Sequence, residues 1–445
     1  MISQIEGSDV SNLLDVSPMS RMQISILFIA VLLAMMDGFD LLGMAFVAPA
    51  LSHAWGLGKG TLGLLLSTSL IGMAVGSLGL SPIADVAGRK PMVLISIALV
   101  ILGSLLSAFC HAVPTLAACR ILTGIGIGTM VPLTTTIASE FANTLRRPFA
   151  IAATTVGLPA GSIIGALVAS ILLKHVGWPS VFVSGAVAGA ILLPIVALWL
   201  PESPAFLIAR RPQDALGRLN RTLLRAGRSG LTELPAGLVA KRASYRSLFM
   251  PGLIGITVRL VAVQVLVSTT AYYLINWLPQ MVADLGFPPS TGSLASAVSS
   301  VVGMFSGLLF GFFASRFGPA RLASVAMIGF GVAIATFGIV PPVLPMLILS
   351  AAACGFFLNG ATGIFYATVA ASFPPLSRVS GIGFVIGIGR VFSIAGPALA
   401  GWLFSAGLGR GQVSLIFGIA PILAGLLLIA TARRQPAQLV AGLAA

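Results

Sequence analysis

Long apolar segments alternate with short polar ones along almost the whole chain. Twelve of the apolar segments have about 20 residues or more, the length that an α-helix needs to cross a bilayer core of about 30 Å. They cover residues 22–51, 61–83, 92–112, 115–139, 148–173, 178–200, 249–279, 292–314, 321–341, 344–372, 380–406 and 411–432. The pattern therefore predicts an all-α integral membrane protein with twelve transmembrane helices.

The segments form two sets of six that carry related sequences. The residues DVAGR at 85–89 follow the second segment, and SRFG at 315–318 follows the eighth, 230 positions later. Arg146 and Arg378, which precede the fifth and the eleventh segments, are 232 positions apart. Duplicated six-helix halves are an architecture of membrane transporters. We therefore expect two six-helix bundles related by pseudo-symmetry.

Five regions follow from this pattern: a tail at 1–21, a first bundle at 22–200, a central loop at 201–248, a second bundle at 249–432 and a tail at 433–445. The polar start of the chain is expected to be a cytoplasmic tail and not a signal peptide. In the central loop, leucines and arginines would occupy opposite faces of a helix over 214–228. Such a basic amphipathic helix is expected to lie on lipid headgroups, with a flexible linker as the alternative.

The basic residues determine the expected orientation. Only 8% of residues are charged and 57% are hydrophobic, which excludes a soluble domain. Of the 25 Lys and Arg, 19 fall in alternate loops that share one side with both termini, while the opposite side holds only Lys59, Lys174 and Arg410. Because Lys and Arg accumulate in cytoplasmic loops, both termini are expected in the cytoplasm. The net charge of +14 then reflects topology and not a nucleic-acid partner.

Two aspartates, Asp37 and Asp40, lie inside the first apolar segment, where no other residue between Ile24 and Leu51 is charged. Ionisable groups at membrane depth are costly and usually functional. Their i, i+3 spacing places both on one helix face, and two neighbouring buried carboxyls resist being ionised together. One of them could therefore exchange a proton during transport. The alternative is a structural ion pair with an arginine of another helix.

Two arginines are also expected inside the membrane. Arg120 lies in the fourth segment, where the alternative to a functional role is snorkelling to the interface. Arg390 lies near the middle of the eleventh segment, in a glycine-rich stretch, and no segment of the second half contains an acid. A guanidinium binds a carboxylate in a two-pronged geometry. We therefore predict that Arg390 binds the anionic group of a substrate.

Aromatic and amide side chains are expected to complete the substrate site. Stacking together with one or two hydrogen bonds would suit a phenolic ring. For Trp277 the alternative is an interfacial aromatic belt. The residues predicted for this pocket are Tyr273, Asn276, Trp277, Asn359 and Tyr366.

Several motifs resemble those of the major facilitator superfamily, over almost the whole chain. The loop SPIADVAGRK at 81–90 is similar to its signature between the second and third helices, RILTGIGIG at 120–128 to a motif linked with proton coupling, and PESP at 201–204 to an ending of the sixth helix. The resemblance implies a cytoplasmic gate. Its predicted residues are Asp85, Gly88, Arg89, Arg146 and Arg378.

Three further motifs resemble one branch of that superfamily, the aromatic acid:proton symporters. They are DGFD at 37–40, SEF at 139–141 and the glycine-rich stretch at 381–397 that contains Arg390. The resemblance implies import of a benzoate-type or hydroxybenzoate-type acid together with protons. Asp37, Asp40, Arg120 and Glu140 are the residues predicted to take part in proton coupling.

Other classes of function have little support. The sequence shows no metal-ligand cluster, nucleophile constellation or Walker-type phosphate loop, so we expect no enzyme and no cofactor besides the coupling proton. The three cysteines lack metal-ligand spacing and are expected to fill space. We expect a monomer in the cell inner membrane, with a small aromatic acid, protons and lipid as partners. A porter for another organic acid or a sugar, a proton-driven exporter and a non-transporting sensor stay as alternatives.

Overall fold

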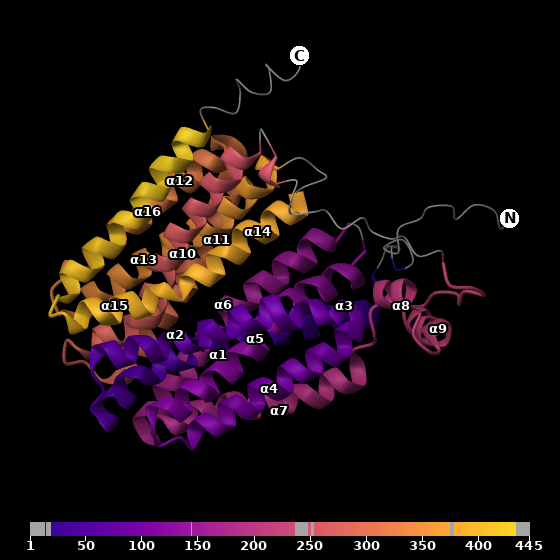
Figure 1. Ribbon diagram of the computed structural model, residues 1–445, viewed down its shortest axis with the longest axis horizontal. Helices are drawn as coiled ribbons and strands as arrows, with labels where there is room; N and C mark the ends of the chain where they lie inside the picture. Colours follow the sequence, from indigo (N-terminus) through magenta and orange to yellow (C-terminus); the bar gives the residue numbers. More distant parts are fainter. Residues whose placement is uncertain are drawn as a thin grey trace, which may run out of the picture. The chain divides into compact units, whose positions relative to one another are not determined.

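The structure is a computed structural model that describes residues 14, 19–143, 145–235, 248–250, 253–373 and 378–432 (Figure 1). Within these residues the regular structure is entirely helical. The α-helices are α1 (Arg21–Trp55), α2 (Lys59–Val75), α3 (Ala84–Ala87), α4 (Arg89–Ala108), α5 (Val113–Phe141), α6 (Arg147–His175), α7 (Pro179–Trp199), α8 (Pro204–Arg210), α9 (Ala215–Arg225), α10 (Ile254–Ala283), α11 (Pro289–Phe317), α12 (Pro319–Ile339), α13 (Leu344–Ser372), α14 (Arg378–Ser393), α15 (Ala395–Ser405) and α16 (Arg410–Ala432).

The described chain contains 12 helical spans that are long and apolar enough to cross a membrane. Ten of the long helices are spans by themselves. Two spans are composite: α2 continues through α3 over Lys59–Ala87, and α14 continues into α15 over Gly381–Ser405. The predicted class, an all-α membrane protein with twelve spanning helices, is confirmed.

Proline explains where the two composite spans are interrupted. Pro82 lies in a 3-10 turn that follows a π turn over Gly76–Leu80, and Pro397 lies in the first turn of α15. Proline has no N–H to continue the helical hydrogen-bond ladder, and its ring displaces the carbonyl one turn earlier. Each span therefore changes helical geometry before its proline and continues beyond it.

Packing divides the described chain into two compact units. Unit 1 contains α3, α4, α5, α7, α8 and α9, with the first part of α1, the last part of α2 and most of α6. Unit 2 contains α10 to α16 together with Leu42–Leu70 and Ala166–Trp178. These units divide α1, α2 and α6 and so differ from the two predicted bundles, 22–200 and 249–432. The division into those bundles stays a prediction.

Glycines allow the helices of unit 1 to approach closely. In α5, a Cβ added at Gly126 would lie 2.6 Å from the carbonyl oxygen of Ser96 on α4, and one at Gly128 would lie 2.1 Å from that of Met73 on α2. Without side chains at these positions, the backbones of three helices lie in direct contact. On the other side of α4, α7 packs alongside it (Figure 1).

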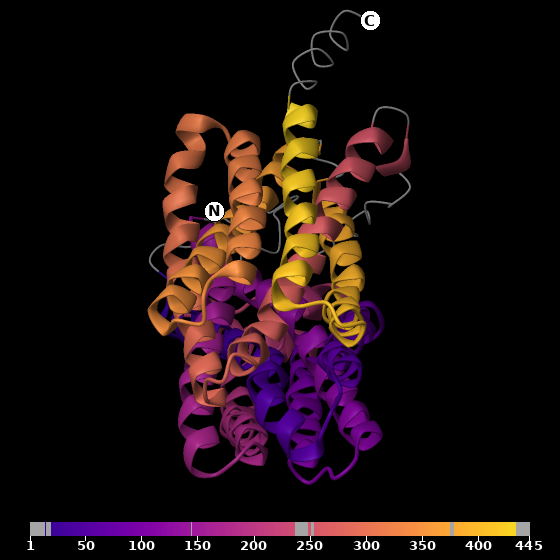
Figure 2. The same ribbon diagram turned by 90° about the vertical axis from the view of Figure 1, so that its left-hand side faces the viewer.

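The helices of unit 2 coloured orange to yellow run roughly parallel to one another (Figure 2). The main packing pairs are α12 with α13 and α16, α11 with α13, and α10 with α14 and α16. Close approach again depends on glycine, because a Cβ at Gly355 on α13 would lie 2.0 Å from the carbonyl oxygen of Ser299 on α11. A buried core that includes Phe330, Ile334 and Phe365 supports these contacts.

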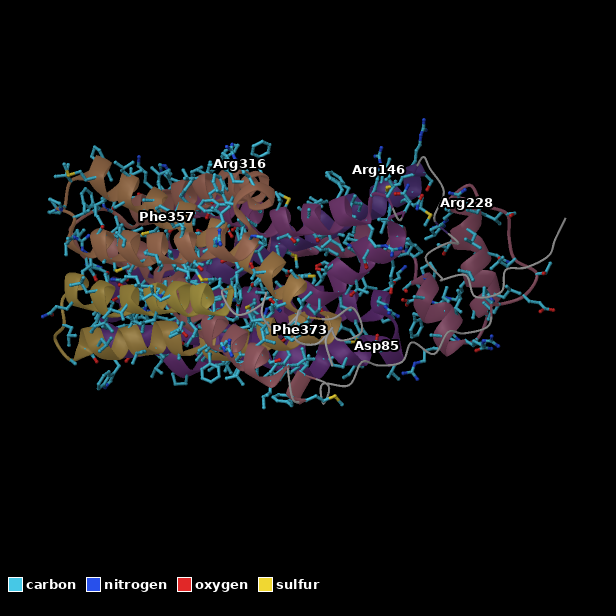
Figure 3. All side chains as sticks on the ribbon, turned by 90° about the horizontal axis from the view of Figure 1, so that it is seen from above. Asp85, Arg146, Arg228, Arg316, Phe357 and Phe373 are labelled. Carbon is cyan, nitrogen blue, oxygen red and sulfur yellow. The ribbon has the colours of Figure 1, made fainter. Side chains whose placement is uncertain are left out.

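One end of unit 1, where α4 begins and α5 ends, carries most of its charge; we call it the charged end. Asp85, Arg146 and Arg228 lie toward this end (Figure 3), and Arg210 of α8 donates to the carbonyl oxygen of Asp85 at 2.8 Å. The predicted amphipathic helix is present as α9, but protein covers its buried face. Leu219 and Leu223 are 0% and 1% exposed, whereas Leu224 is 63% exposed. The contact of this helix with lipid headgroups stays a prediction.

Candidate functional site

Asp40 and Arg120 are joined through a serine hydroxyl inside unit 1. Ser104 Oγ, on α4, donates a hydrogen bond to Asp40 Oδ1 at 3.0 Å and accepts one from Arg120 Nη2 at 3.2 Å. All three side chains are buried. The carboxylate and the guanidinium therefore interact electrostatically through an intervening hydroxyl.

Arg120 is also held by groups that do not depend on Asp40. Its Nε donates to Ser107 Oγ at 3.1 Å, and its Nη2 donates to Thr123 Oγ1 at 2.8 Å. The guanidinium carbon lies 4.4 Å from the centre of the Phe182 ring, a cation–π contact. Since Arg120 is 0% exposed, protein atoms surround it and the snorkelling alternative is wrong.

Two polar atoms of this cluster have no hydrogen bond within the part of the chain that is described. They are Asp40 Oδ2 and Arg120 Nη1, both buried. A buried polar atom without a hydrogen bond costs about 1–3 kcal/mol, and more when the group is charged. Asp37, one helical turn before Asp40, is also buried at 1% exposure. Both predicted aspartates are thus buried on α1.

Two glycines that sequence reasoning missed make room for this cluster. A Cβ added at Gly185, on α7, would lie 2.8 Å from Asp40 Oδ1. One added at Gly103, on α4, would lie 2.4 Å from Thr123 Oγ1. Gly185 and Gly189 have the GxxxG spacing of close helix contacts, which was a usable signal. Gly103 and Ser107 have the related small-xxx-small spacing.

A second charge cluster occupies the charged end of unit 1. Arg89 Nη2 lies 3.0 Å from Glu140 Oε1 and 3.7 Å from Asp85 Oδ1. Glu140 also accepts a hydrogen bond from the Ser203 hydroxyl. Glu202 Oε1 accepts from the backbone N–H of Arg89 at 2.8 Å, at the first turn of α4, where a carboxylate is favoured by the helix dipole.

Gly88 lets the backbone pass close to the Glu202 carboxylate. Its φ of 105° lies in the region that favours glycine. A Cβ there would also lie 2.5 Å from Glu202 Oε2. The structure therefore brings together three predicted gating residues, Asp85, Gly88 and Arg89. They lie around Glu202, which was not predicted as a site residue. The PESP motif contained Glu202, but its sequence did not indicate which group the carboxylate would contact.

The remaining gating and coupling predictions have different outcomes. Glu140 lies with the predicted gating residues, 20 residues after Arg120 on α5, which is about 30 Å along a helix. Arg146 has an exposed side chain at the charged end, and its backbone N–H donates to Asn143 Oδ1 at 2.9 Å. Arg378 begins α14, but its side chain lies outside the described set.

Arg390, on α14 of unit 2, faces polar and aromatic groups from α10 and α13. Its guanidinium interacts electrostatically with the phenols of Tyr272 and Tyr366. Tyr366 lies near Gln264, whose Nε2 donates to Ser268 Oγ at 2.8 Å. Among the side chains that are described, none forms a hydrogen bond or an ion pair with the Arg390 guanidinium. Its charge is thus available to an anionic ligand.

Three of the predicted pocket residues do not join this group. Tyr273 is 0% exposed, hydrogen-bonds Ser414 Oγ at 2.9 Å and stacks on Phe417, on the face of α10 that packs against α16. Trp277 is also 0% exposed and donates to the carbonyl oxygen of Pro397 at 3.0 Å, so the belt alternative is wrong as well. Asn276 donates to the carbonyl oxygen of Tyr272 in its own helix.

The amide of Asn359 packs against α11. A Cβ at Gly303 would lie 2.2 Å from Asn359 Nδ2, which also donates to the carbonyl oxygen of Gly355 at 3.2 Å. Tyr366 is therefore the predicted pocket residue that the structure brings to Arg390. Gln264 and Ser268 were missed. Their spacing to Tyr272, i, i+4 and i+8, marks a polar stripe on one face of α10 that could have been found.

The described residues contain 12 helices that are long and apolar enough to cross a membrane, and Asp37, Asp40 and Arg120 are buried inside unit 1. Ionisable groups buried at membrane depth are typical of membrane transporters. The chain belongs to the Major Facilitator Superfamily, whose profile matches residues 26–279 and 260–442. The protein is therefore a multi-pass membrane transporter and not an enzyme, as predicted.

Two relatives have names that specify a substrate. The chain is 30% identical to the gallate transporter of Pseudomonas putida over 427 residues, which cover 95% of this chain and 94% of that protein. It is also 30% identical to the 4-hydroxybenzoate transporter PcaK of Pseudomonas putida over 413 residues, 91% of each chain. The predicted resemblance to aromatic acid transporters is confirmed by this similarity.

A solved structure shows the same fold. The crystal structure of a D-xylose-proton symporter matches with a TM-score of 0.72 and 17% sequence identity, over 91% of this chain and 97% of that one. At this identity the likeness concerns the fold alone.

Proposed function

We propose that the protein is a proton-coupled symporter that imports an aromatic carboxylate of the benzoate or hydroxybenzoate type by alternating access. The observation that carries the proposal is the Arg390 guanidinium, which faces Tyr272 and Tyr366 and pairs with no acid of the described chain. The names of the two similar transporters support an aromatic acid as the substrate.

In this proposal Arg390 binds the substrate carboxylate through two parallel N–H donors. The phenol rings of Tyr272 and Tyr366 supply flat surfaces and hydroxyl groups for an aromatic ring. The Gln264 amide, already hydrogen-bonded to Ser268, offers an acceptor oxygen to a ring hydroxyl. A hydroxylated aromatic acid would therefore satisfy more of these groups than an aliphatic acid of the same charge.

The proton step is assigned to Asp40. Protonation at Oδ2, the oxygen without a hydrogen bond, would neutralise the carboxylate and leave the Ser104 bond to Oδ1 in place. Arg120 would stay fixed, because Ser107, Thr123 and Phe182 hold it independently. Asp40 can thus gain and lose a proton while Arg120 stays in its position. Asp37, one turn earlier, is proposed to share in this exchange.

The charged end of unit 1 is proposed to be the cytoplasmic gate. Arg89 binds Glu140 and Asp85 there, and Glu202 fixes the start of α4. Protonation of Glu140 would weaken its pair with Arg89, which gives that residue a route to influence coupling. Arg146 and Arg378 are proposed to contribute at the same side. We propose this orientation for a monomer in the inner membrane, with both termini in the cytoplasm.

The experiment that tests the proposal is uptake into proteoliposomes. Labelled gallate, 4-hydroxybenzoate, benzoate and xylose would each be offered with and without an inward proton gradient. We expect gradient-driven uptake of the aromatic acids, abolished in Arg390→Ala. In Asp40→Asn, uptake against a concentration gradient should be lost, while exchange of internal for external substrate is retained.

Three results would contradict the proposal. Transport of xylose with none of the aromatic acids would overturn the substrate assignment. Uptake that does not respond to the proton gradient would overturn proton coupling. Gradient-driven efflux in oriented vesicles would indicate an exporter.

A further inference from the structure

Two of the three cysteines, nine positions apart in the sequence, meet at the end of unit 1 opposite the charged end. Cys110 follows the last turn of α4, and Cys119 lies in the second turn of α5. Their Sγ atoms are 3.7 Å apart, and both side chains are partly exposed. We propose that Cys110 and Cys119 are a redox-sensitive site that forms an intramolecular disulfide linking α4 to α5 beside Arg120.

The geometry requires only a small movement to form the bond. The sulfurs would approach from 3.7 Å to about 2.0 Å, the length of a disulfide. Cys110 lies outside the helices, in the short connection before α5, so its backbone can adjust. Its thiol contacts the carbonyl oxygen of Leu106 at 3.3 Å, a weak contact that the reaction would replace. Cys354, in contrast, is 0% exposed and lies in unit 2.

The chemistry is thiol–disulfide exchange with a disulfide-bearing oxidant. One thiolate attacks the oxidant disulfide, giving a mixed disulfide and releasing a thiolate. The second cysteine then attacks the mixed disulfide, forms the Sγ–Sγ bond and releases the second thiol of the oxidant. Two protons leave the protein thiols, and the two electrons reduce one disulfide of the oxidant to two thiols.

The bond would act close to the proposed coupling site. Cys119 immediately precedes Arg120, and its carbonyl oxygen accepts the Thr123 hydroxyl at 3.0 Å. Thr123 in turn accepts from Arg120 at 2.8 Å. A cross-link at Cys119 therefore restrains the turn of α5 that carries Arg120 and Thr123. In the proposed orientation this end faces outward, toward the compartment in which disulfides persist.

Thiol counting on the full-length protein tests the site without any transport assay. Membranes would be treated with oxidised glutathione or with dithiothreitol, acid-quenched, denatured and labelled with a maleimide of known mass. We expect one free thiol after oxidation and three after reduction. In Cys110→Ser the count should stay at two under both treatments. In Cys354→Ser it should change from none to two, which assigns the bond to Cys110 and Cys119.

Mass spectrometry of the peptide that contains both cysteines should show the loss of two hydrogen atoms. Three free thiols in the oxidised wild type would overturn the proposal. Thiol loss in Cys110→Ser would overturn it too, because it would indicate glutathione adducts or bonds between chains.

Uptake measurements test whether the disulfide affects transport through Arg120. Of the experiments on this disulfide, only the uptake measurement rests on the proposed function. Oxidation should slow gradient-driven uptake several-fold in the wild type, reversibly with dithiothreitol, and leave Cys110→Ser unchanged. A disulfide that forms with no change in uptake would overturn the link to Arg120. If no aromatic acid is transported at all, the thiol count still decides whether the disulfide exists.

Discussion

The Asp40 carboxylate reaches the Arg120 guanidinium through the hydroxyl of Ser104, which donates to the acid and accepts from the base. A direct ion pair would hold both charges in place. The Ser104 hydroxyl between them weakens the attraction between the two charges, and it can stay in position when the Asp40 carboxyl is neutral. The arrangement suits a carboxyl group whose charge changes during a cycle.

Replacing Ser104 with alanine should therefore destabilise the protein and impair coupling. Asp40 Oδ1 would lose its donor and Arg120 an acceptor inside the unit, at a cost of about 1–3 kcal/mol. Thermal unfolding in detergent and gradient-driven uptake would measure the two effects. Ser96→Ala is the matched control, because Ser96 is equally buried on α4 but bonds only a carbonyl of its own helix. Equal effects of the two changes would contradict the bridging role.

Gly185→Ala should strongly reduce transport. The new Cβ would lie 2.8 Å from Asp40 Oδ1, so α7 or the carboxylate has to move. A displaced acid should lower gradient-driven uptake by about tenfold or more, since sub-ångström placement matters at such sites. Gly311→Ala on α11, where a Cβ meets nothing within 4 Å, is the control and should transport normally. Normal uptake by Gly185→Ala would show that the acid tolerates displacement.

Glu202→Gln should weaken the charged end of unit 1. The carboxylate accepts from the backbone N–H groups of Arg89 and Lys90 at the start of α4, and hydrogen bonds to a charged group contribute about 1.5–3 kcal/mol. A neutral amide keeps an acceptor but loses the charge, so we expect a loss of about 1–2 kcal/mol in unfolding measurements. The exposed Glu233→Gln should have no measurable effect. The idea fails if both variants unfold like the wild type.

Gln264→Leu should change selectivity among aromatic acids. The apolar side chain cannot bond a ring hydroxyl, so uptake of 4-hydroxybenzoate should fall by about tenfold or more relative to benzoate. Tyr273→Phe is the comparison, because Tyr273 bonds Ser414 away from Arg390. That variant should affect both acids equally. A uniform loss in Gln264→Leu would remove the residue from the substrate site and leave it a packing role.

Much of the architecture was predictable because membrane depth constrains composition so strongly. A lipid-facing helix must be apolar for about 20 residues, so the spans can be recognised without any tertiary knowledge. The same constraint makes Asp37, Asp40, Arg120 and Arg390 conspicuous, since a charge at that depth is rarely accidental. The loop motif likewise brought Asp85, Gly88 and Arg89 forward together.

The pocket around Arg390 was harder to predict, because a buried helix carries apolar or aromatic side chains on several of its faces. Tyr272 and Tyr273 are adjacent in sequence, yet one faces Arg390 and the other packs on Phe417. Rotation of α10 about its axis decides between them, and that rotation is set by packing with α14 and α16. Adjacent residues differ by about 100° around a helix, so a small error in phase exchanges their roles.

The amino-acid sequence by itself determined the spans, the family and the buried charges, because each depends on local composition or on motifs within one loop. Tertiary structure alone decided which groups meet: Ser104 between Asp40 and Arg120, Glu202 at the start of α4, Gln264 beside Tyr366, and Cys110 against Cys119. These contacts depend on the phase and depth at which separate helices pack. No single segment carries that information.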